Sequence, residues 1–373
     1  DRLQGKVGAF TFGLERIDAE LLAACPQLKI CANMTVGYNN FDLPAMSATG
    51  VIGTNAPDTL TETTADFGFT LLMATARRVT ESEHFLRAGL WKSWRFDMFA
   101  GCEVHGSTLG IIGMGKIGQA IAKRGAFGFG MKVIYHNRSR LSPELEAECK
   151  ARYVSKEELL KTADHVMLVV PYSAESHHTI GAAELAQMKP SATLINIARG
   201  GIVDDAALAK ALAARQIAAA GLDVFEGEPS VHPDLLKVPN VVLTPHIGGA
   251  TYDTVMRMVQ QYQGQQLVLF ADNWFTSPTL AVALAQRGIH LCGSVNRRRK
   301  GMPAIPKQQV DALRRGEWLQ RQKGDTTVAV WKDQRTMWVL YNHCSPGETA
   351  SLERWSEAGN KISIGCPRAI RDY

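Results

Sequence analysis

The chain has 373 residues, of which 46% are hydrophobic, and a formal net charge of +5. This length predicts two or three domains, and no apolar run approaches the roughly 18 residues that a membrane helix needs. Seven cysteines without any CxxC spacing argue against a disulfide scaffold and favour a reduced, cytoplasmic protein.

The first 250 residues carry the pattern of an α/β protein. Two early strands and a long helix over Thr61–Arg78 are followed, in residues 106–250, by short β-rich runs that alternate with helical stretches. This alternation is typical of a parallel sheet with crossover helices. The predicted strands are Leu28–Asn33, Val51–Thr54, Leu109–Gly113, Lys132–His136, His165–Val170, Thr193–Ile197, Ala219–Val224 and Val241–Thr244, and further helices are expected at Gly118–Gly125 and Asp205–Ala214.

The pattern changes after Ala250. Helices are expected over Asp253–Tyr262 and Pro278–Arg287, and a strand over Gln266–Ala271 that ends at Asp272. Two β-rich runs, Thr327–Trp331 and Met337–Tyr341, lie on either side of a polar turn and predict a hairpin.

Charge divides the chain at about the same place. Residues 255–373 hold 17 Lys and Arg against 9 Asp and Glu, whereas residues 1–254 have a net charge of −3. A basic module can bind polyanions, although most basic patches are solvated surface. The composition therefore indicates two parts of different origin.

A glycine-rich loop follows the strand that begins at Leu109. In Gly113-Met114-Gly115-Lys116-Ile117-Gly118, the first glycine permits a tight turn and the second lets a pyrophosphate approach the backbone. The third lets helix and strand pack closely, and the helix N-terminus offers N–H donors to phosphates. The loop predicts dinucleotide binding.

The residues after the second strand of this unit bear on the choice of cofactor. An enzyme that prefers NAD places a carboxylate there, on the ribose hydroxyls, whereas this chain has His136-Asn137-Arg138-Ser139-Arg140. Two guanidinium groups and a hydroxyl would bind a 2′-phosphate. We therefore expect NADPH, with NADH as a possible cofactor and a solvated basic turn as the alternative interpretation.

Three polar residues follow strands of the same predicted sheet. Arg199 can clamp a carboxylate and polarise the adjacent carbonyl, His246 can deliver a proton near neutral pH, and Glu228 can bond the other imidazole nitrogen. Each alone is compatible with an ordinary structural role. Together, at the strand ends where such folds bind ligands, they predict reduction of a 2-oxo acid. His177-His178 carries no such context and is interpreted as a loop or helix start.

Several stretches share the pattern of a known family: residues 33–42, 110–118, 195–204, 221–229 and 244–250. Residues 1–250 resemble the D-isomer-specific 2-hydroxyacid dehydrogenases, especially the glyoxylate/hydroxypyruvate reductase and 2-ketogluconate reductase branch. The resemblance implies reduction of glyoxylate, hydroxypyruvate or 2-ketogluconate, with catalytic Arg199, Glu228 and His246 and with His246 as proton donor. It also implies a homodimer formed through the nucleotide domain, with Thr61–Leu90 near the contact.

The resemblance implies further site residues. The backbone N–H groups of Val36 and Gly37 would bind the substrate carboxylate together with Arg199 and His246, and Asp223 would hold the nicotinamide carboxamide. The remaining residues implied for the cofactor are Gly113, Gly115, Lys116, Ile117, Gly118, Asn137, Arg138, Ser139, Arg140, Ile197, Gly248 and Gly249. Trp91, Trp94 and Arg95 are candidates for shaping the pocket.

The chain departs from the family pattern at both ends of the resemblance. It starts too late to contain the first strand and helix of the substrate domain, and the returning final helix is replaced by other sequence. The chain also begins without Met or a signal segment, which indicates an internal cut. We expect a truncated, flavodoxin-like substrate-binding domain over residues 1–60, a Rossmann-type nucleotide domain over 61–250, and a different domain over 251–373.

That last part has motifs of its own. The run Asp272-Asn273-Trp274-Phe275-Thr276-Ser277 and residues 288–295, 298–302 and 328–336 are similar to the catalytic core of piggyBac-type transposases. The resemblance implies an α+β, RNase H-like fragment in which Asp272 matches one of three metal-binding aspartates. One carboxylate cannot hold a two-metal site, so we expect no working metal site. Asp325 and Asp333 are interpreted as solvated.

Three functions are consistent with these sequence features. The first is an NADPH-dependent 2-oxo acid reductase fused to a transposase fragment. The second is a DNA-associating fusion that binds weakly and without sequence specificity through Arg297–Lys300. The third is a non-functional chimera that retains only nucleotide binding. We expect the first, because it uses all the chemical groups named above.

Overall fold

The computed structural model describes residues 3–11, 13, 15–33, 35–251, 253–254, 257, 268–271, 276–355 and 360–372. The chain divides into two compact units, Asp1–Thr254 and Val255–Tyr373. All seven cysteines are free thiols, five of them buried. No helix in the described part of the chain is long and apolar enough to cross a membrane.

The first unit begins with a small three-stranded parallel sheet in the order β1-β2-β3. The strands are β1 (Gly8–Thr11), β2 (Ile30–Asn33) and β3 (Ile52–Thr54), with helices α1 (Ala19–Ala24) and α2 (Leu43–Thr49). Each helix begins at an aspartate, Asp18 or Asp42, whose side chain accepts a hydrogen bond from a backbone N–H of the first turn. Leu22, Phe41 and Met46 belong to the core beneath this sheet.

The larger part of the first unit is a seven-stranded, fully parallel sheet in the order β10-β9-β8-β7-β4-β5-β6. The order reverses between β4 and β7, which creates the crevice where such sheets bind ligands. The strands are β4 (Thr108–Ile112), β5 (Lys132–His136), β6 (Ala151–Tyr153), β7 (His165–Leu168), β8 (Thr193–Asn196), β9 (Ala219–Leu222) and β10 (Val241–Leu243).

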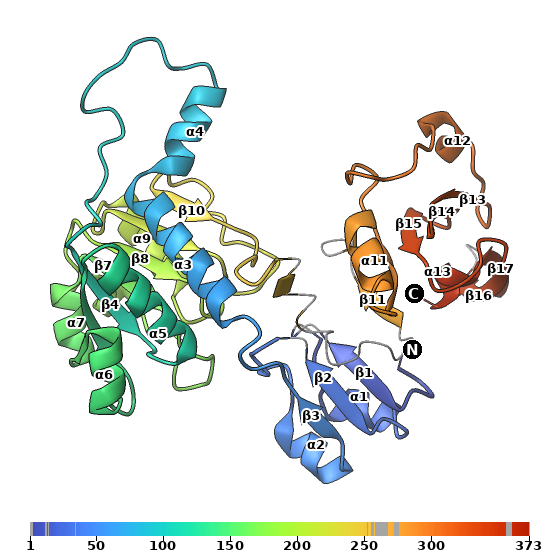
Figure 1. The fold of residues 1–373 in the computed structure, drawn as a ribbon, viewed down its shortest axis with the longest axis horizontal. Helices are drawn as coiled ribbons and strands as arrows, with labels where there is room; N and C mark the ends of the chain where they lie inside the picture. The colour runs from blue at the N-terminus through green and yellow to red at the C-terminus, as the bar shows by residue number, and fades with distance from the viewer. Residues whose placement is uncertain are drawn as a thin grey trace. The chain divides into compact units, whose positions relative to one another are not determined.

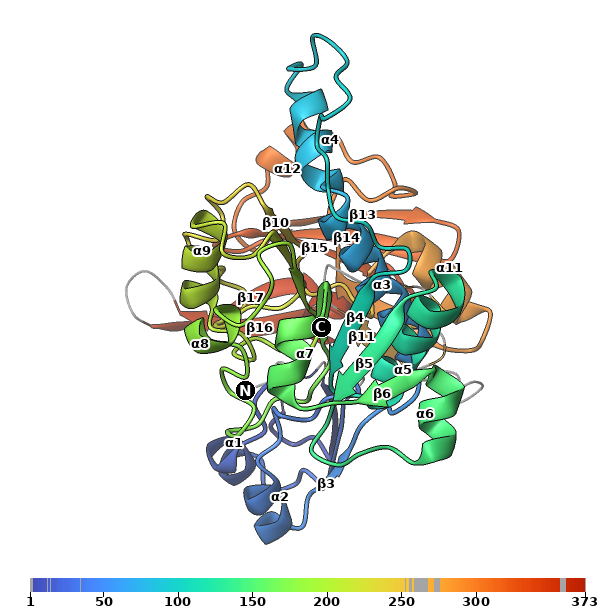
Figure 2. The ribbon, with the colours of Figure 1, turned by 90° about the vertical axis from the view of Figure 1, so that its left-hand side faces the viewer.

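Helices cover both faces of this sheet (Figure 1 and Figure 2). Successive strand residues enter opposite cores: Ile111 packs with the helices on one face and Ile112 with those on the other. One face carries α3 (Thr61–Ala76) and α5 (Lys116–Lys123), and the other carries α7 (Lys156–Thr162), α8 (Ala182–Leu185) and α9 (Asp205–Ala213). The π-helix η1 (Arg124–Gly128) continues α5, and α6 (Pro143–Cys149) precedes β6.

One segment extends away from this sheet. Helix α4 (Val79–Arg87) follows α3 and leads into a long loop, residues 88–100, which projects from the sheet in Figure 1. Its large apolar side chains are exposed, with Trp94 at 73% and Phe96 at 93%. A cluster of exposed apolar side chains can mark an interaction surface.

The second unit is built on a five-stranded mixed sheet in the order β11-β12-β15-β14-β13. Strands β11 and β12 are parallel, and the other neighbouring pairs are antiparallel. A separate hairpin joins β16 to β17. The elements are β11 (Val268–Ala271), α11 (Pro278–Ala285), β12 (His290–Ser294), α12 (Lys307–Asp311), β13 (Trp318–Lys323), β14 (Thr326–Lys332), β15 (Thr336–Tyr341), β16 (Thr349–Trp355), β17 (Lys361–Pro367) and α13 (Arg368–Asp372).

The structure confirms the α/β class, the Rossmann-type parallel sheet and the predicted hairpin, which is β14–β15. Asp272 and most of the predicted helix Asp253–Tyr262 lie outside the described residues. The interpretation of Asp333 as solvated was wrong. Its carboxylate is mostly buried and pairs with Arg315 at 2.9 Å and Arg354 at 3.1 Å. Arg315 precedes β13, which pairs antiparallel with β14 just before Asp333, whereas Arg354 lies in β16 of the separate hairpin.

Candidate active site

The glycine loop connects β4 to α5. Gly113 has a φ of +102°, and a Cβ there would lie 2.7 Å from the backbone of Val169 and Val170, so only glycine fits. A Cβ on Gly118 would overlap the carbonyl oxygen of Gly113. A Cβ on Gly115 would instead meet nothing within 4 Å, and no side chain caps the first N–H groups of α5. The loop therefore leaves an open, donor-lined cradle that fits a pyrophosphate.

The turn after β5 lies beside this loop. The Asn137 side chain accepts a hydrogen bond from the Met114 N–H at 2.7 Å, which ties the turn to the glycine loop. Arg138, Ser139 and Arg140 are exposed. The Nε and Nη2 atoms of Arg140 bond both oxygens of Glu146, at 2.9 and 2.7 Å. Arg140 is thus engaged within the chain, and Arg138 offers the less committed guanidinium.

Arg199 follows β8 and turns toward the first domain of its unit. Its Nη1 donates to the Ala198 carbonyl at 2.8 Å, and its Nε donates to Asn39 Oδ1 at 3.4 Å. A Cβ on Gly37 would overlap Arg199 Nη2. Burial lowers the pKa of Arg199, and the charge of Glu228 opposes that effect. The guanidinium therefore remains a cation in a partly dry environment, which strengthens its attraction for a carboxylate.

His246 and Glu228 form a hydrogen-bonded pair. The Nδ1 atom of His246 lies 2.8 Å from Glu228 Oε2, and the second oxygen of Glu228 accepts from the Phe225 N–H at 2.8 Å. Burial raises the pKa of Glu228, but the hydrogen bonds and the charges of His246 and Arg199 outweigh it and hold the pKa below its usual value. A carboxylate on Nδ1 leaves Nε2 to carry a proton toward a bound substrate.

The carboxylate of Asp223 holds the backbone around His246, although we had expected Asp223 only to bind the cofactor. Asp223, 2% exposed, accepts hydrogen bonds from Thr244 Oγ1 at 2.7 Å and from the N–H groups of Ile247 and Gly248 at 2.9 and 2.8 Å. His246 itself has a φ of +52°, an uncommon conformation for a residue with a side chain. Asp223 therefore fixes the loop that presents the imidazole, and no sequence signal indicated these bonds.

The remaining predicted residues lie in loops that follow strands or at the first turn of α5. Carbonyl oxygens of Val36 and Gly37 accept hydrogen bonds from Asn55 and Asn33, and no bond within the described residues uses the N–H groups of Val36 or Gly37. Lys116 pairs with Asp58 at 2.5 Å, and Ile197 packs against Gly68 of α3. Gly248 lies against Asp223, and Gly249 against Leu60. Trp91, Trp94 and Arg95 are instead exposed on the extension beyond α4.

Comparison with known proteins defines the class. Residues 69–248 match the NAD-binding domain of the D-isomer-specific 2-hydroxyacid dehydrogenases, and residues 241–373 match the family described as Transposase IS4. The chain belongs to the D-isomer-specific 2-hydroxyacid dehydrogenase family, and its last part is a transposase-like fragment.

Individual relatives agree with this assignment. The chain is 53% identical over 270 residues to a glyoxylate reductase of Thermococcus onnurineus, covering 71% of this chain and 80% of the relative. It also resembles a glyoxylate reductase structure from Paecilomyes thermophila, with 37% identity and a TM-score of 0.63 over 68% and 77% of the two chains. An NADPH-dependent glyoxylate/hydroxypyruvate reductase from Sinorhizobium meliloti, solved with NADP and malonate, gives 35% identity and a TM-score of 0.60 over 68% and 76%.

Proposed function

We propose that the first unit is an NADPH-dependent reductase of small 2-oxo acids, which converts glyoxylate, hydroxypyruvate or 2-ketogluconate into the D-2-hydroxy acid. The observation that carries the proposal is the 2.8 Å hydrogen bond between His246 and Glu228, beside a half-buried Arg199. The identity to glyoxylate reductases supports the substrate class.

In this proposal each polar group has one task. Arg199, with the N–H groups of Val36 and Gly37, binds the substrate carboxylate and polarises the neighbouring carbonyl. Glu228 orients the imidazole of His246, which donates its proton to the carbonyl oxygen as that oxygen becomes a hydroxyl. Asp223 keeps the His246 loop in place.

The cofactor would lie along the open cradle at the start of α5. Gly115, Lys116 and Ile117 would hold its pyrophosphate, and Ile197, Gly248 and Gly249 would lie nearer the nicotinamide. When bound, the reduced nicotinamide supplies the two electrons of the reduction. The preference for NADPH rests on Asn137, Arg138, Ser139 and Arg140, with Arg138 as the main contributor because Arg140 is paired with Glu146.

We further propose a homodimer that forms through α4 and residues 88–100. The support is the group of exposed apolar side chains on this extension, because a partner would remove them from water: Leu86, Leu90, Trp91, Trp94 and Phe96. The proposed domains are residues 1–60 for substrate binding, 61–250 for the nucleotide and 251–373 for the transposase-like fragment.

The decisive experiment measures NADPH oxidation by the purified full chain with hydroxypyruvate and with glyoxylate. His246→Ala should reduce kcat by about 10²–10⁴-fold, the usual contribution of a general acid, while NADPH binding is retained. His105→Ala is the matched control, because His105 is exposed in the turn before β4. Turnover that survives in His246→Ala would refute the assigned proton donor.

A parent chain that binds NADPH but shows no turnover would favour the chimera that retains only nucleotide binding. The DNA-associating alternative rests on Arg297–Lys300, most of which is exposed in the turn after β12. Neutralising these four residues should abolish any salt-sensitive DNA retention and leave the reductase rate unchanged.

A further inference from the structure

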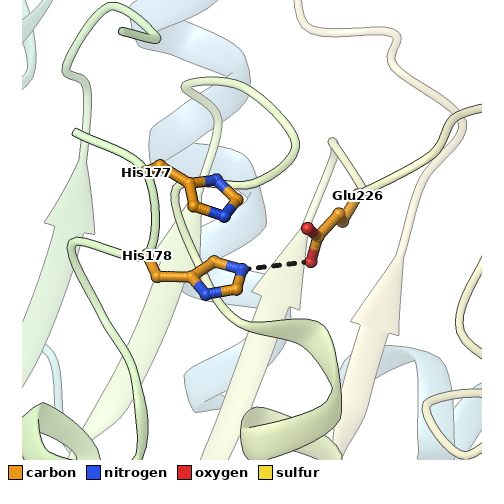
Figure 3. Close-up of side chains that lie close together, drawn as sticks. All are labelled: His177, His178 and Glu226. Carbon is orange, nitrogen blue, oxygen red and sulfur yellow. Dashed lines mark hydrogen bonds and ion pairs between the residues drawn. The ribbon is translucent and has the colours of Figure 1, made fainter. Parts of the chain in front are cut away.

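Three metal-ligating side chains gather beside the site described above. His177 and His178 lie between β7 and α8, and Glu226 lies in the loop after β9. One ligand atom from each of the three lies within 4.8 Å of the other two. Figure 3 shows the Glu226 carboxylate pointing toward His178, with the His177 ring next to it.

The spacing already approaches that of a coordination sphere. The Nε2 atom of His178 lies 3.2 Å from Glu226 Oε2. Two ligand atoms bound to the same tetrahedral zinc ion are about 3.3 Å apart. The two imidazole rings are stacked with centroids 3.8 Å apart. His177 and Glu226 are exposed, so small side-chain rotations can bring the third ligand atom closer.

Neighbouring groups orient these ligands. The Tyr172 hydroxyl lies 3.3 Å from His177 Nδ1, which leaves Nε2 of that ring for an ion. The backbone N–H of His178 donates to the Gly201 carbonyl at 2.7 Å, and the backbone N–H of Glu226 donates to Asp205 Oδ2 at 3.0 Å, which fixes the main chain at both residues. A supporting bond to the second ring nitrogen, such as the one between Tyr172 and His177, is common for metal-binding histidines.

We propose that His177, His178 and Glu226 form a binding site for a divalent transition-metal ion of the zinc type, with water completing the coordination. Two imidazoles and one carboxylate suit Zn²⁺ and its neighbours, whereas Mg²⁺ and Ca²⁺ prefer oxygen ligands. The ion would join the loop after β7 to the loop after β9, which also carries Glu228.

The simpler interpretation is an ion pair between His178 and Glu226 that binds no metal. Two observations argue for more than a pair. His177 is a third ligand with a supporting partner, and no ion pair is needed to place Glu226, whose backbone is already held by Asp205. The sequence alone predicted no metal here, because Glu226 is 48 residues from His178.

The test is competition for Zn²⁺ between the full chain and a chromogenic chelator. His177→Gln, His178→Gln and Glu226→Gln should each weaken the tightest site by more than the roughly 10–100-fold that loss of a supporting partner costs. Tyr172→Phe, which removes such a partner, should fall within that range. His84→Gln and Glu83→Gln are matched controls, because they alter another exposed His–Glu neighbour pair and should leave the affinity unchanged.

Two further readouts keep the test independent of misfolding. Zn²⁺ should raise the thermal unfolding midpoint of the parent and not of the three ligand variants, while all of them retain NADPH binding. Co²⁺, used as a spectroscopic probe, should give the visible absorption of a four-coordinate site in the parent only. The proposal is overturned if the parent leaves the chelator fully loaded, or if Zn²⁺ binds equally well to the ligand variants.

Discussion

Replacing Gly37 with alanine should impair the proposed reductase although it removes no catalytic side chain. A Cβ on residue 37 would overlap Arg199 Nη2 and lie 3.0 Å from Cζ and 3.3 Å from Nε. Comfortable carbon contacts need about 3.5–4.0 Å, so the guanidinium must move by more than about 1 Å. A displacement of that size in a substrate-positioning group costs about 10²-fold in rate. We therefore expect kcat/KM to fall by about two orders of magnitude.

The assay is NADPH oxidation with hydroxypyruvate, beside NADPH binding and thermal unfolding, which should change little. Gly128→Ala is the control, because a Cβ there meets nothing within 4 Å. A double-mutant cycle identifies the cause: Gly37→Ala should add no further loss in an Arg199→Ala background. Activity of Gly37→Ala within twofold of the parent, in a folded protein, would refute this account of the contact.

Three further predictions concern the nucleotide domain. Arg138→Ala should weaken NADPH binding by about 10–100-fold, the value of one charged hydrogen bond, and Arg140→Ala by less, in fluorescence titrations; an equal loss of NADH affinity would contradict the 2′-phosphate assignment. Leu160→Ala, at a fully buried position, should destabilise the domain by about 2–5 kcal/mol in urea unfolding, whereas Leu236→Ala, at an exposed position, should change stability by less than about 0.5 kcal/mol. Hydrogen bonds from Arg140 and Tyr135 lower the pKa of Glu146 to about 2, below its ordinary 4.5, so this carboxylate stabilises the fold fully above pH 4.5 and loses that effect as the pH falls toward 2. Glu146→Gln should flatten the acid-unfolding curve in that window, and an unchanged curve would rule the contribution out.

The sequence predicted the large parallel sheet because its strands are apolar on both faces. β7 and β8 are continuously buried, and such runs stand out between amphipathic helices. The glycine loop was also recognisable from local sequence, because its three glycines lie within a few residues of one another. β6 was missed because it is a three-residue edge strand with no buried residue. The β16–β17 hairpin was missed as well, because much of its surface is exposed.

Pairings between distant residues could not be read from the sequence. Asp223 is 21 to 25 residues from the groups that it binds, so its role in holding the His246 loop depends on β9 and β10 lying side by side. The sequence contains the charges of Arg140 and Glu146, but it does not predict that they pair. The pair forms because of the course of the chain into α6. For the same reason, the sequence did not predict that His178 and Glu226 lie close together.

The end of the first unit has a consequence for how this chain arose. The loop after β10 is secured by Asp223, and Thr254, the last residue of the unit, bonds both Thr63 of α3 and Thr251 at about 3 Å. The loop that carries His246 is therefore held by contacts made within its own unit. A join after Thr254 would therefore exchange the downstream sequence and leave these contacts intact.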